Sequence, residues 1–294
     1  MKNEWTKLIK HPAIIWSLVI MILIVIYSYI SVAHMFQNMY PSFMEEASFT
    51  EQEMIDYIKQ ADRTEPFHSM LFVLSSSMAI TYALASVNAV GPIIISILAA
   101  ILFGIEYRYV TLRQLWVNGL SRIQIIINKM SSILLIILLL MLLSIITAFI
   151  TSLIVPELFN LPMNLIEYPT IVISDIVLQL SGTIISLLLW GMFTACMTVV
   201  TKSIVGGLIL GLVYPILEFS IIDQWLIGKY FPLFIQKSML PILFHDTDPG
   251  GFVSFYPMPE IYQLHESFLL TGAYTGLFFI IMLIVLKRQK VLMA

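Results

Sequence analysis

Long uncharged runs of apolar residues constrain the fold of this chain more than any other feature. Ala13 to Ala33 carries no charged side chain, and comparable runs recur along most of the sequence. Apolar residues make up 59% of the 294 positions, charged residues 11%, and the mean hydropathy is +0.94. A water-soluble domain does not have that composition. Because the runs are continuous and rich in Leu and Ile, they predict an all-α integral membrane protein and not a β-barrel.

The apolar runs also predict where the chain crosses the membrane, since a transmembrane helix needs ~20 apolar residues. The uncharged run from Phe67 to Ile105 is too long for one simple crossing, so Ser69 to Ala85 is interpreted as an interfacial or re-entrant helix. Residues 1–294 are treated as one transmembrane domain. Its six predicted spans are about 13–33, 87–105, 130–155, 176–200, 203–222 and 267–286.

The charged residues separate by side in this topology. Basic residues gather near the N-terminus, between the second and third spans, and after the sixth span. The positive-inside rule therefore places both termini and residues 106–129 in the cytoplasm. Residues 34–66 are predicted to form an acidic extracellular loop, and residues 223–266 a second one with short helices on the outer leaflet. Of the 18 acidic residues, only Glu4 and Glu106 fall on the cytoplasmic side.

Residues 106–129 are the most informative segment for function, because they place several basic side chains beside a single acid, Glu106. Their spacing fits a short amphipathic helix along the cytoplasmic surface. Glu106 could pair with Arg108 or Arg122, or cap a helix N-terminus. Two interpretations remain open. The segment is either a docking site for a soluble partner, or a loop that only fixes the orientation of the protein in the membrane. In the second case residues such as Arg108 and Lys129 are anchored in lipid headgroups.

The same segment resembles the cytoplasmic segment of type-2 ABC exporter permeases. That family shows a Glu, then Gly-Thr, then a Pro-x-Ser-Arg-like element, then a Lys. This chain departs from the pattern at Val110, in place of the Gly, and at Gly119-Leu120, where Pro-Val is common. The positions that carry the resemblance are Glu106, Thr111, Leu112, Arg113, Leu115, Ser121, Arg122 and Lys129. Six spans, cytoplasmic termini and a long outer segment before the last span extend the resemblance over nearly the whole chain.

The resemblance implies a coupling helix that docks into a separate ATPase subunit. It also implies two permease subunits, identical or different, in a bacterial plasma membrane, with lipids and no nucleic acid as further partners. The sequence contains no GxxxxGK[ST] motif, so ATP and its Mg²⁺ are expected in the partner, and this chain is expected to be neither an enzyme nor a cofactor carrier. The coupling residues implied by the resemblance are Glu106, Thr111, Arg113, Ser121, Arg122 and Lys129.

The substrate is expected to be hydrophobic or amphipathic, such as a peptide antibiotic, a drug or a lipid. The acidic outer loop could attract cationic peptides, although solvated acids need no such explanation. Two other functions remain open. An ion-coupled secondary transporter would need intramembrane ion-coupling groups and often an internal repeat. A membrane scaffold or sensor subunit would keep the partner contacts without a substrate path.

A few polar and small residues within the predicted spans are further candidates. Glu218, Asp175 and Asn88 are possible pathway residues, because polar groups at membrane depth are costly. The two acids could instead lie at the outer boundary, and Asn88 could join two helices. Gly207 and Gly211 have GxxxG spacing, which brings either a second subunit or a neighbouring helix of the same subunit close. The histidines form no HExxH motif, so no metal site is expected.

Overall fold

The fold is a computed structural model that describes residues 12–60, 66–108, 119, 121–166, 173–222 and 264–289. Its long helices are α2 (Pro12–Glu46), α5 (Ala79–Arg108), α7 (Arg122–Leu158), α8 (Ile173–Thr201), α9 (Ile204–Ile222) and α11 (Leu264–Gln289). Its short elements are α3 (Glu51–Gln60), α4 (Pro66–Leu74) and the 3₁₀ turns η1 (Ser76–Met78) and η2 (Met163–Leu165). Within the described ranges every regular element is a helix, which confirms the all-α prediction for them.

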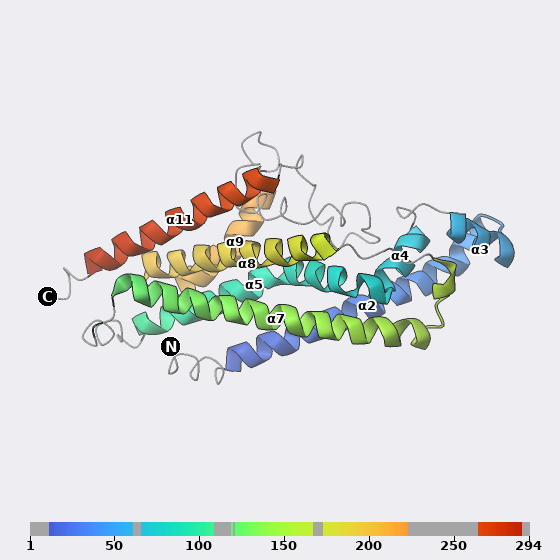
Figure 1. The fold of residues 1–294 in the computed structure, drawn as a ribbon, viewed down its shortest axis with the longest axis horizontal. Helices are drawn as coiled ribbons and strands as arrows, with labels where there is room; N and C mark the ends of the chain where they lie inside the picture. Colours follow the sequence, from blue (N-terminus) through green and yellow to red (C-terminus); the bar gives the residue numbers. More distant parts are fainter. Residues whose placement is uncertain are drawn as a thin grey trace.

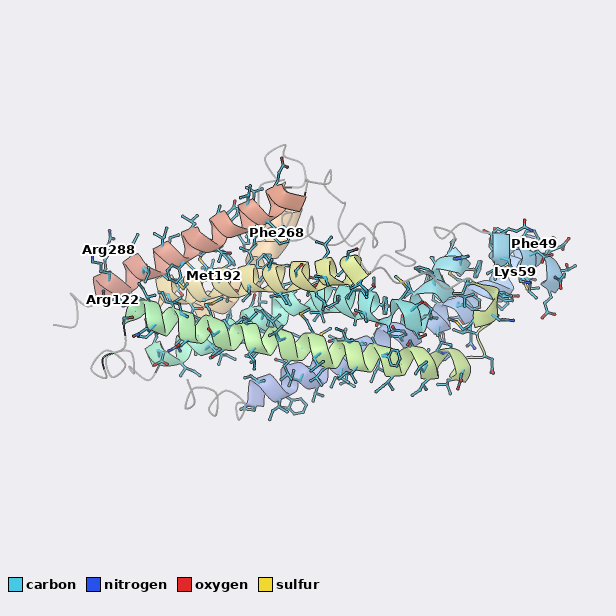
Figure 2. All side chains as sticks on the ribbon, viewed as in Figure 1. Phe49, Lys59, Arg122, Met192, Phe268 and Arg288 are labelled. Carbon is cyan, nitrogen blue, oxygen red and sulfur yellow. The ribbon has the colours of Figure 1, made fainter. Side chains whose placement is uncertain are left out.

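The long helices form an elongated bundle (Figure 1). α5 packs against α2, α7, α8 and α9, while α11 packs mainly against α8. Arg122 and Arg288 lie at one end of the bundle, and Phe49 and Lys59 lie at the other (Figure 2). We call the first the basic end, where α5 ends and α7 begins. The second is the acidic end, where α2 ends beside α3 and α4.

Five of the described helices are long and apolar enough to cross a membrane, so the chain is a multi-pass membrane protein. α9 stands at the place of the fifth predicted span. Its described apolar stretch, Ile204–Tyr214, is shorter than a crossing needs, so the sixth crossing stays a prediction. The five qualifying segments are Pro12–Ala47, Ser76–Tyr107, Arg122–Leu158, Ile176–Thr201 and Phe268–Arg288.

The acidic segment 34–66 contains far more helix than a loop. α2 runs on to Glu46, and its 35 residues span about 52 Å, well beyond the ~30 Å hydrocarbon core. Aromatic packing supports the protruding part: the ring of Phe43 lies 5.2 Å from Phe67 and 5.5 Å from Tyr57, measured between centroids. Hydropathy finds the membrane-embedded length of a helix and misses an extension of this kind.

The long second apolar run breaks at a different place from the predicted one. The structure divides it into α4, η1 and α5, so the crossing helix begins at Ala79 and the helix before it ends at Leu74. Ser75 lies at the break, and its hydroxyl donates a 2.6 Å hydrogen bond to the carbonyl of Phe72. Serine side chains compete in this way with helical backbone bonds, which explains the interruption.

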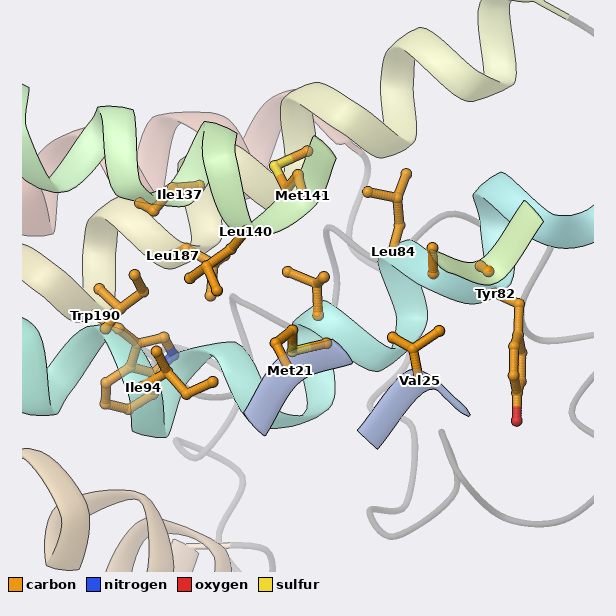
Figure 3. Packing of buried hydrophobic residues seen from close by; sticks show 14 of the residues in the cluster. Met21, Val25, Tyr82, Leu84, Ile94, Ile137, Leu140, Met141, Leu187 and Trp190 are labelled. Carbon is orange, nitrogen blue, oxygen red and sulfur yellow. The ribbon is translucent and has the colours of Figure 1, made fainter. Parts of the chain in front are cut away.

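The core of the bundle lies where α2, α5, α7 and α8 meet (Figure 3). In a membrane this packing gains van der Waals contact, because lipid is as apolar as the side chains themselves. Trp190 of α8 is fully buried here, and so is Leu187 one turn before it. The other labelled members are Met21, Val25, Tyr82, Leu84, Ile94, Ile137, Leu140 and Met141.

Candidate functional site

The candidate site is the basic end of the bundle, where the chain leaves α5 and returns in α7. A capping box fixes the start of α7. The backbone N–H of Gln124 donates to Ser121 Oγ at 3.2 Å, and the backbone N–H of Ser121 donates to Gln124 Oε1 at 2.9 Å. Each bond satisfies a backbone donor that a bare helix end would leave open. Ser121, one of the predicted coupling residues, therefore determines where the third long helix begins.

Glu106 and Lys129 form an ion pair between the last turns of α5 and the first turns of α7. The Lys129 Nζ lies 3.1 Å from Glu106 Oε1, and the two side chains are 4% and 12% exposed. Lys129 Nζ also donates a 2.5 Å hydrogen bond to the carbonyl of Leu102 and lies 5.5 Å from the ring centroid of Phe103. The ammonium group is thus held by a carboxylate, a carbonyl and an aromatic face.

Helix geometry explains why these groups converge. Leu102 and Glu106 are four residues apart, and Phe103 and Glu106 are three apart, so all three lie on one face of α5. Lys129 faces them from α7. A charge in such a low-dielectric place is costly unless it is paired and hydrogen-bonded, and both conditions hold for Lys129. The arrangement ties two helices together at the point where the intervening chain departs.

This geometry corrects two sequence-based interpretations. Lys129 was interpreted as a possible lipid anchor, but its side chain is buried and its Nζ bonds inside the bundle, so that interpretation is wrong. Glu106 was expected to pair with Arg108 or Arg122, or to cap a helix N-terminus. It forms an ion pair with Lys129 and lies in the last turn of α5, so the capping interpretation is wrong, while pairing with either arginine stays a prediction.

The structure describes less of the other predicted coupling residues. Arg122 is the first residue of α7 and is partly buried at the basic end. Thr111 and Arg113 lie outside the described residues. Gly119 is described, and its φ of +80° is the left-handed conformation that glycine adopts without strain. The predicted amphipathic helix between α5 and α7 therefore stays a prediction.

Of the predicted pathway residues, Asn88 is the one whose side chain is described. It is 8% exposed, and its Nδ2 donates a 2.7 Å hydrogen bond to Thr183 Oγ1 of α8 and a 3.0 Å bond to the carbonyl of Leu84. Asn88 therefore joins α5 to α8, which confirms the interpretation that it links two helices. Asp175 lies in α8 and Glu218 in α9, and the positions of their side chains are outside what the structure describes.

The two glycines of the GxxxG pair pack inside the chain, against α8. A Cβ added to Gly207 would overlap Thr198 Oγ1 and lie 3.0 Å from Thr198 Cα. A Cβ added to Gly211 would lie 2.6 Å from Thr194 Oγ1. These glycines let α9 approach α8 closely, so the structure supports packing within one subunit over contact with a second.

The sequence analysis missed a buried polar face on α8. Neighbouring members are three or four residues apart, except for a gap of eight between Ser186 and Thr194, and this spacing places them along one side of the helix. Thr194 Oγ1 donates a 3.0 Å hydrogen bond to Ser96 Oγ of α5, the second such link after Asn88 and Thr183. The i, i+3, i+4 spacing was readable in the sequence as a polar stripe within an apolar run. The face consists of Gln179, Thr183, Ser186, Thr194 and Thr198.

The acidic end carries a shallow pocket of about 470 Å³. Its lining combines apolar and aromatic surface with one carboxylate, from Tyr40, Pro41, Met44, Glu45 and Phe49. Acids predominate in the helices around it, where the described charged residues are Glu45, Glu46, Glu51, Glu53, Asp56 and Lys59. Hydrogen bonds from the backbone N–H and the hydroxyl of Thr50 hold the pKa of the Glu53 carboxyl below its ordinary value.

Comparison with known proteins agrees with this arrangement. The family described as ABC-2 family transporter protein matches residues 1–218, which include α2 to α8, most of α9 and both helix ends that meet at Glu106 and Lys129. No curated protein and no solved structure matches the chain. Since the match covers well over half of the 294 residues, the chain belongs to the ABC-2 transporter family and is a membrane-embedded permease.

Proposed function

We propose that this chain is the membrane-spanning subunit of an ATP-binding cassette exporter, driven by a separate ATPase that docks on residues 106–129. The observation that carries the proposal is the basic end itself. α5 and α7 end and begin there, within the family match, and their ends are tied by a buried ion pair. The chain between them is therefore presented from one fixed point, as a docking segment requires.

The assembly we propose contains two permease subunits and two ATPase subunits in the bacterial plasma membrane, with the basic end in the cytoplasm. The ATPase subunits bind ATP and Mg²⁺. This orientation follows from the charges at the two ends of the bundle, because basic residues near span ends favour the cytoplasmic side. Cysteines at Glu53 and at Arg288, in a Cys196→Ala background, test it with an impermeant thiol reagent on intact cells. Labelling at position 53 alone is expected. Labelling at position 288 alone would mean that the protein has the opposite orientation.

The substrate we propose is hydrophobic or amphipathic: a peptide antibiotic, a drug or a lipid, moved across or out of the bilayer. Two features support this class. Apart from Lys129 and its partner Glu106 at the basic end, the buried side chains of the described bundle are apolar or uncharged polar ones. The pocket at the acidic end combines aromatic surface with the Glu45 carboxylate, which suits a ligand with an apolar body and a positive charge.

The central test is association with the ATPase. The permease is purified from its native membrane, copurifying proteins are checked for ATP binding and hydrolysis, and the pair is reconstituted in proteoliposomes. Arg113→Glu and Arg122→Glu reverse charges at the docking segment, so they should reduce copurification and ATP-driven transport together. Lys59→Glu makes the same charge reversal at the acidic end and serves as the control. Equal copurification for all three variants would contradict the docking proposal.

The same preparation distinguishes the rival functions. Copurification with an ATPase but no turnover on reconstitution would favour a scaffold or sensor subunit. Transport driven by a proton gradient in the absence of ATP would favour a secondary transporter. ATP hydrolysis stimulated by candidate peptides, drugs or lipids would support the exporter and would identify its substrate class.

A further inference from the structure

We infer that the Glu106–Lys129 ion pair is a positioning joint that makes the basic ends of α5 and α7 move as one body when the ATPase pushes on the segment between them. The inference rests on the proposed function and adds a role for two residues that the family pattern suggests only as docking residues. In this role the ATPase docks on the residues between Glu106 and Lys129, and neither of these two residues touches it.

Burial argues against direct docking. The side chains of Lys129 and Glu106 are 4% and 12% exposed, so a soluble partner could not reach them without opening the bundle. Their charges are satisfied within the chain, through the 3.1 Å ion pair and the Lys129 bond to the Leu102 carbonyl. A docking contact needs side chains that the partner can reach, and the side chains of Glu106 and Lys129 are already bonded to each other.

The position of the ion pair determines which helices receive a force from the ATPase. The pair joins residues 23 apart in sequence, where the chain leaves α5 and where it returns in α7. A force applied to the residues between them would therefore pass to both helices through the ion pair. Without the ion pair, the same force could turn α7 about its own axis while α5 stayed in place. A buried pair is also little weakened by salt, so the joint holds under cellular ionic strength.

The two helices lead to different parts of the bundle. α7 runs from the basic end to the acidic end, where Gln37 Nε2 of α2 donates a 2.9 Å hydrogen bond to the carbonyl of Phe159, just after α7. α5 is bonded to α8 through Asn88 and Thr183. A link between α5 and α7 therefore passes one movement of the ATPase to α2, through α7, and to α8, through α5.

A matched pair of substitutions separates this role from docking. Glu106→Gln has the same shape and leaves an oxygen for Lys129, but it removes the charge. Glu106→Asp keeps the charge and withdraws it by one methylene. Spin labels replace Ile93 of α5 and Ile127 of α7, which are 51% and 50% exposed, in a Cys196→Ala background. The distance between the labels is measured in the permease–ATPase complex, diluted with unlabelled permease, before and after trapping with ATP and vanadate.

The expected result has three parts. The unsubstituted protein and Glu106→Asp keep one narrow distance that trapping does not change. Glu106→Gln copurifies with the ATPase as well as the unsubstituted protein does. On trapping, however, its distance broadens or splits, because α7 now moves without α5. A purely stabilising contact would lower thermal stability in Glu106→Gln but would not make the distance depend on nucleotide.

Three results would overturn the inference: a change of distance on trapping in the unsubstituted protein, an unchanged distance in Glu106→Gln, or loss of ATPase copurification in Glu106→Gln, which would return the residue to docking. Absence of any ATPase from the unsubstituted preparation is a separate result, and it refutes the proposed function as well. If Glu106→Gln does not insert, Lys129→Gln and Lys129→Arg make the same comparison from the other helix.

Discussion

Substitution of Gly207 by alanine should destabilise a single subunit, because the added methyl group has no room. Its Cβ would overlap the Thr198 hydroxyl and lie 2.8 Å from Thr198 Cβ and 3.0 Å from Thr198 Cα. The last of these atoms is backbone, so rotation of one side chain cannot relieve the contact. α9 must instead move away from α8, which loosens their packing.

The magnitude follows from two opposing terms. Overpacking of this kind costs about 2–3 kcal/mol when backbone must shift. Alanine recovers up to about 1 kcal/mol relative to glycine in a helix, since it loses less conformational entropy. The net destabilisation is then about 1–2 kcal/mol, which corresponds to a melting temperature lower by about 2–3 °C for a chain of this size.

The chain offers a control with the same chemistry. Gly276 of α11 has no atom within 4 Å of the position a Cβ would take, so Gly276→Ala should be neutral or slightly stabilising. Thermal unfolding of both variants in detergent measures the difference. Adding Thr198→Ala to Gly207→Ala should recover part of the loss, because it removes the hydroxyl and a methyl group while the Cα remains.

Two outcomes would refute this reasoning. Equal melting temperatures for Gly207→Ala and Gly276→Ala would mean that α9 does not pack on α8 as described. A normal melting temperature with loss of crosslinked dimer in Gly207→Ala would assign the glycine face to contact between two subunits instead.

Three further predictions test other contacts. Lys129→Ala should lower the free energy of unfolding by about 3 kcal/mol, because it leaves Glu106 without its buried ion pair. Lys59→Ala at the exposed acidic end should change the same free energy by less than about 0.5 kcal/mol. Denaturation in mixed micelles measures both variants. A double-mutant cycle of Asn88→Ala and Thr183→Val should give a coupling of about 0.6–2 kcal/mol, and additivity would mean no shared bond. The folded-state pKa of Glu53 is lowered, so its capping of α3 is present above about pH 4 and should be lost as pH falls further. The protection factors of the α3 amides, which compare measured hydrogen exchange with intrinsic exchange at the same pH, should then fall, and should not change in this way in Glu53→Gln.

Much of the fold follows from the sequence because lipid imposes so strong a constraint. Every uncharged run that was predicted to cross lies in a helix, since backbone groups in hydrocarbon must be satisfied within the segment. The ends were harder to predict. α2 continues beyond its predicted end near Ala33, where aromatic contacts between helices replace lipid. Those contacts join residues far apart in sequence, and hydropathy does not register them.

The candidate site shows the same division between local and distant information. The start of α7 was readable, because Ser121 followed three residues later by Gln124 is the signature of a capping box. The polar face of α8 was also readable from its spacing. Both features depend on neighbours within a turn or two of one helix, and sequence reports such neighbours directly.

The contacts of Lys129 could not be predicted from its neighbours in sequence. A lysine near a span end can extend to the headgroups or turn into the bundle, and its neighbours in sequence are the same in both cases. The choice depends on whether another helix offers an acid and a carbonyl at the right depth. α5 offers both, from Glu106 and Leu102, two residues that its own periodicity places on one face. The positive-inside rule counts Lys129 correctly for orientation. The contacts of its Nζ, however, link it to α5, so substitutions here should report first on the spacing of α5 and α7 and only through that spacing on the ATPase.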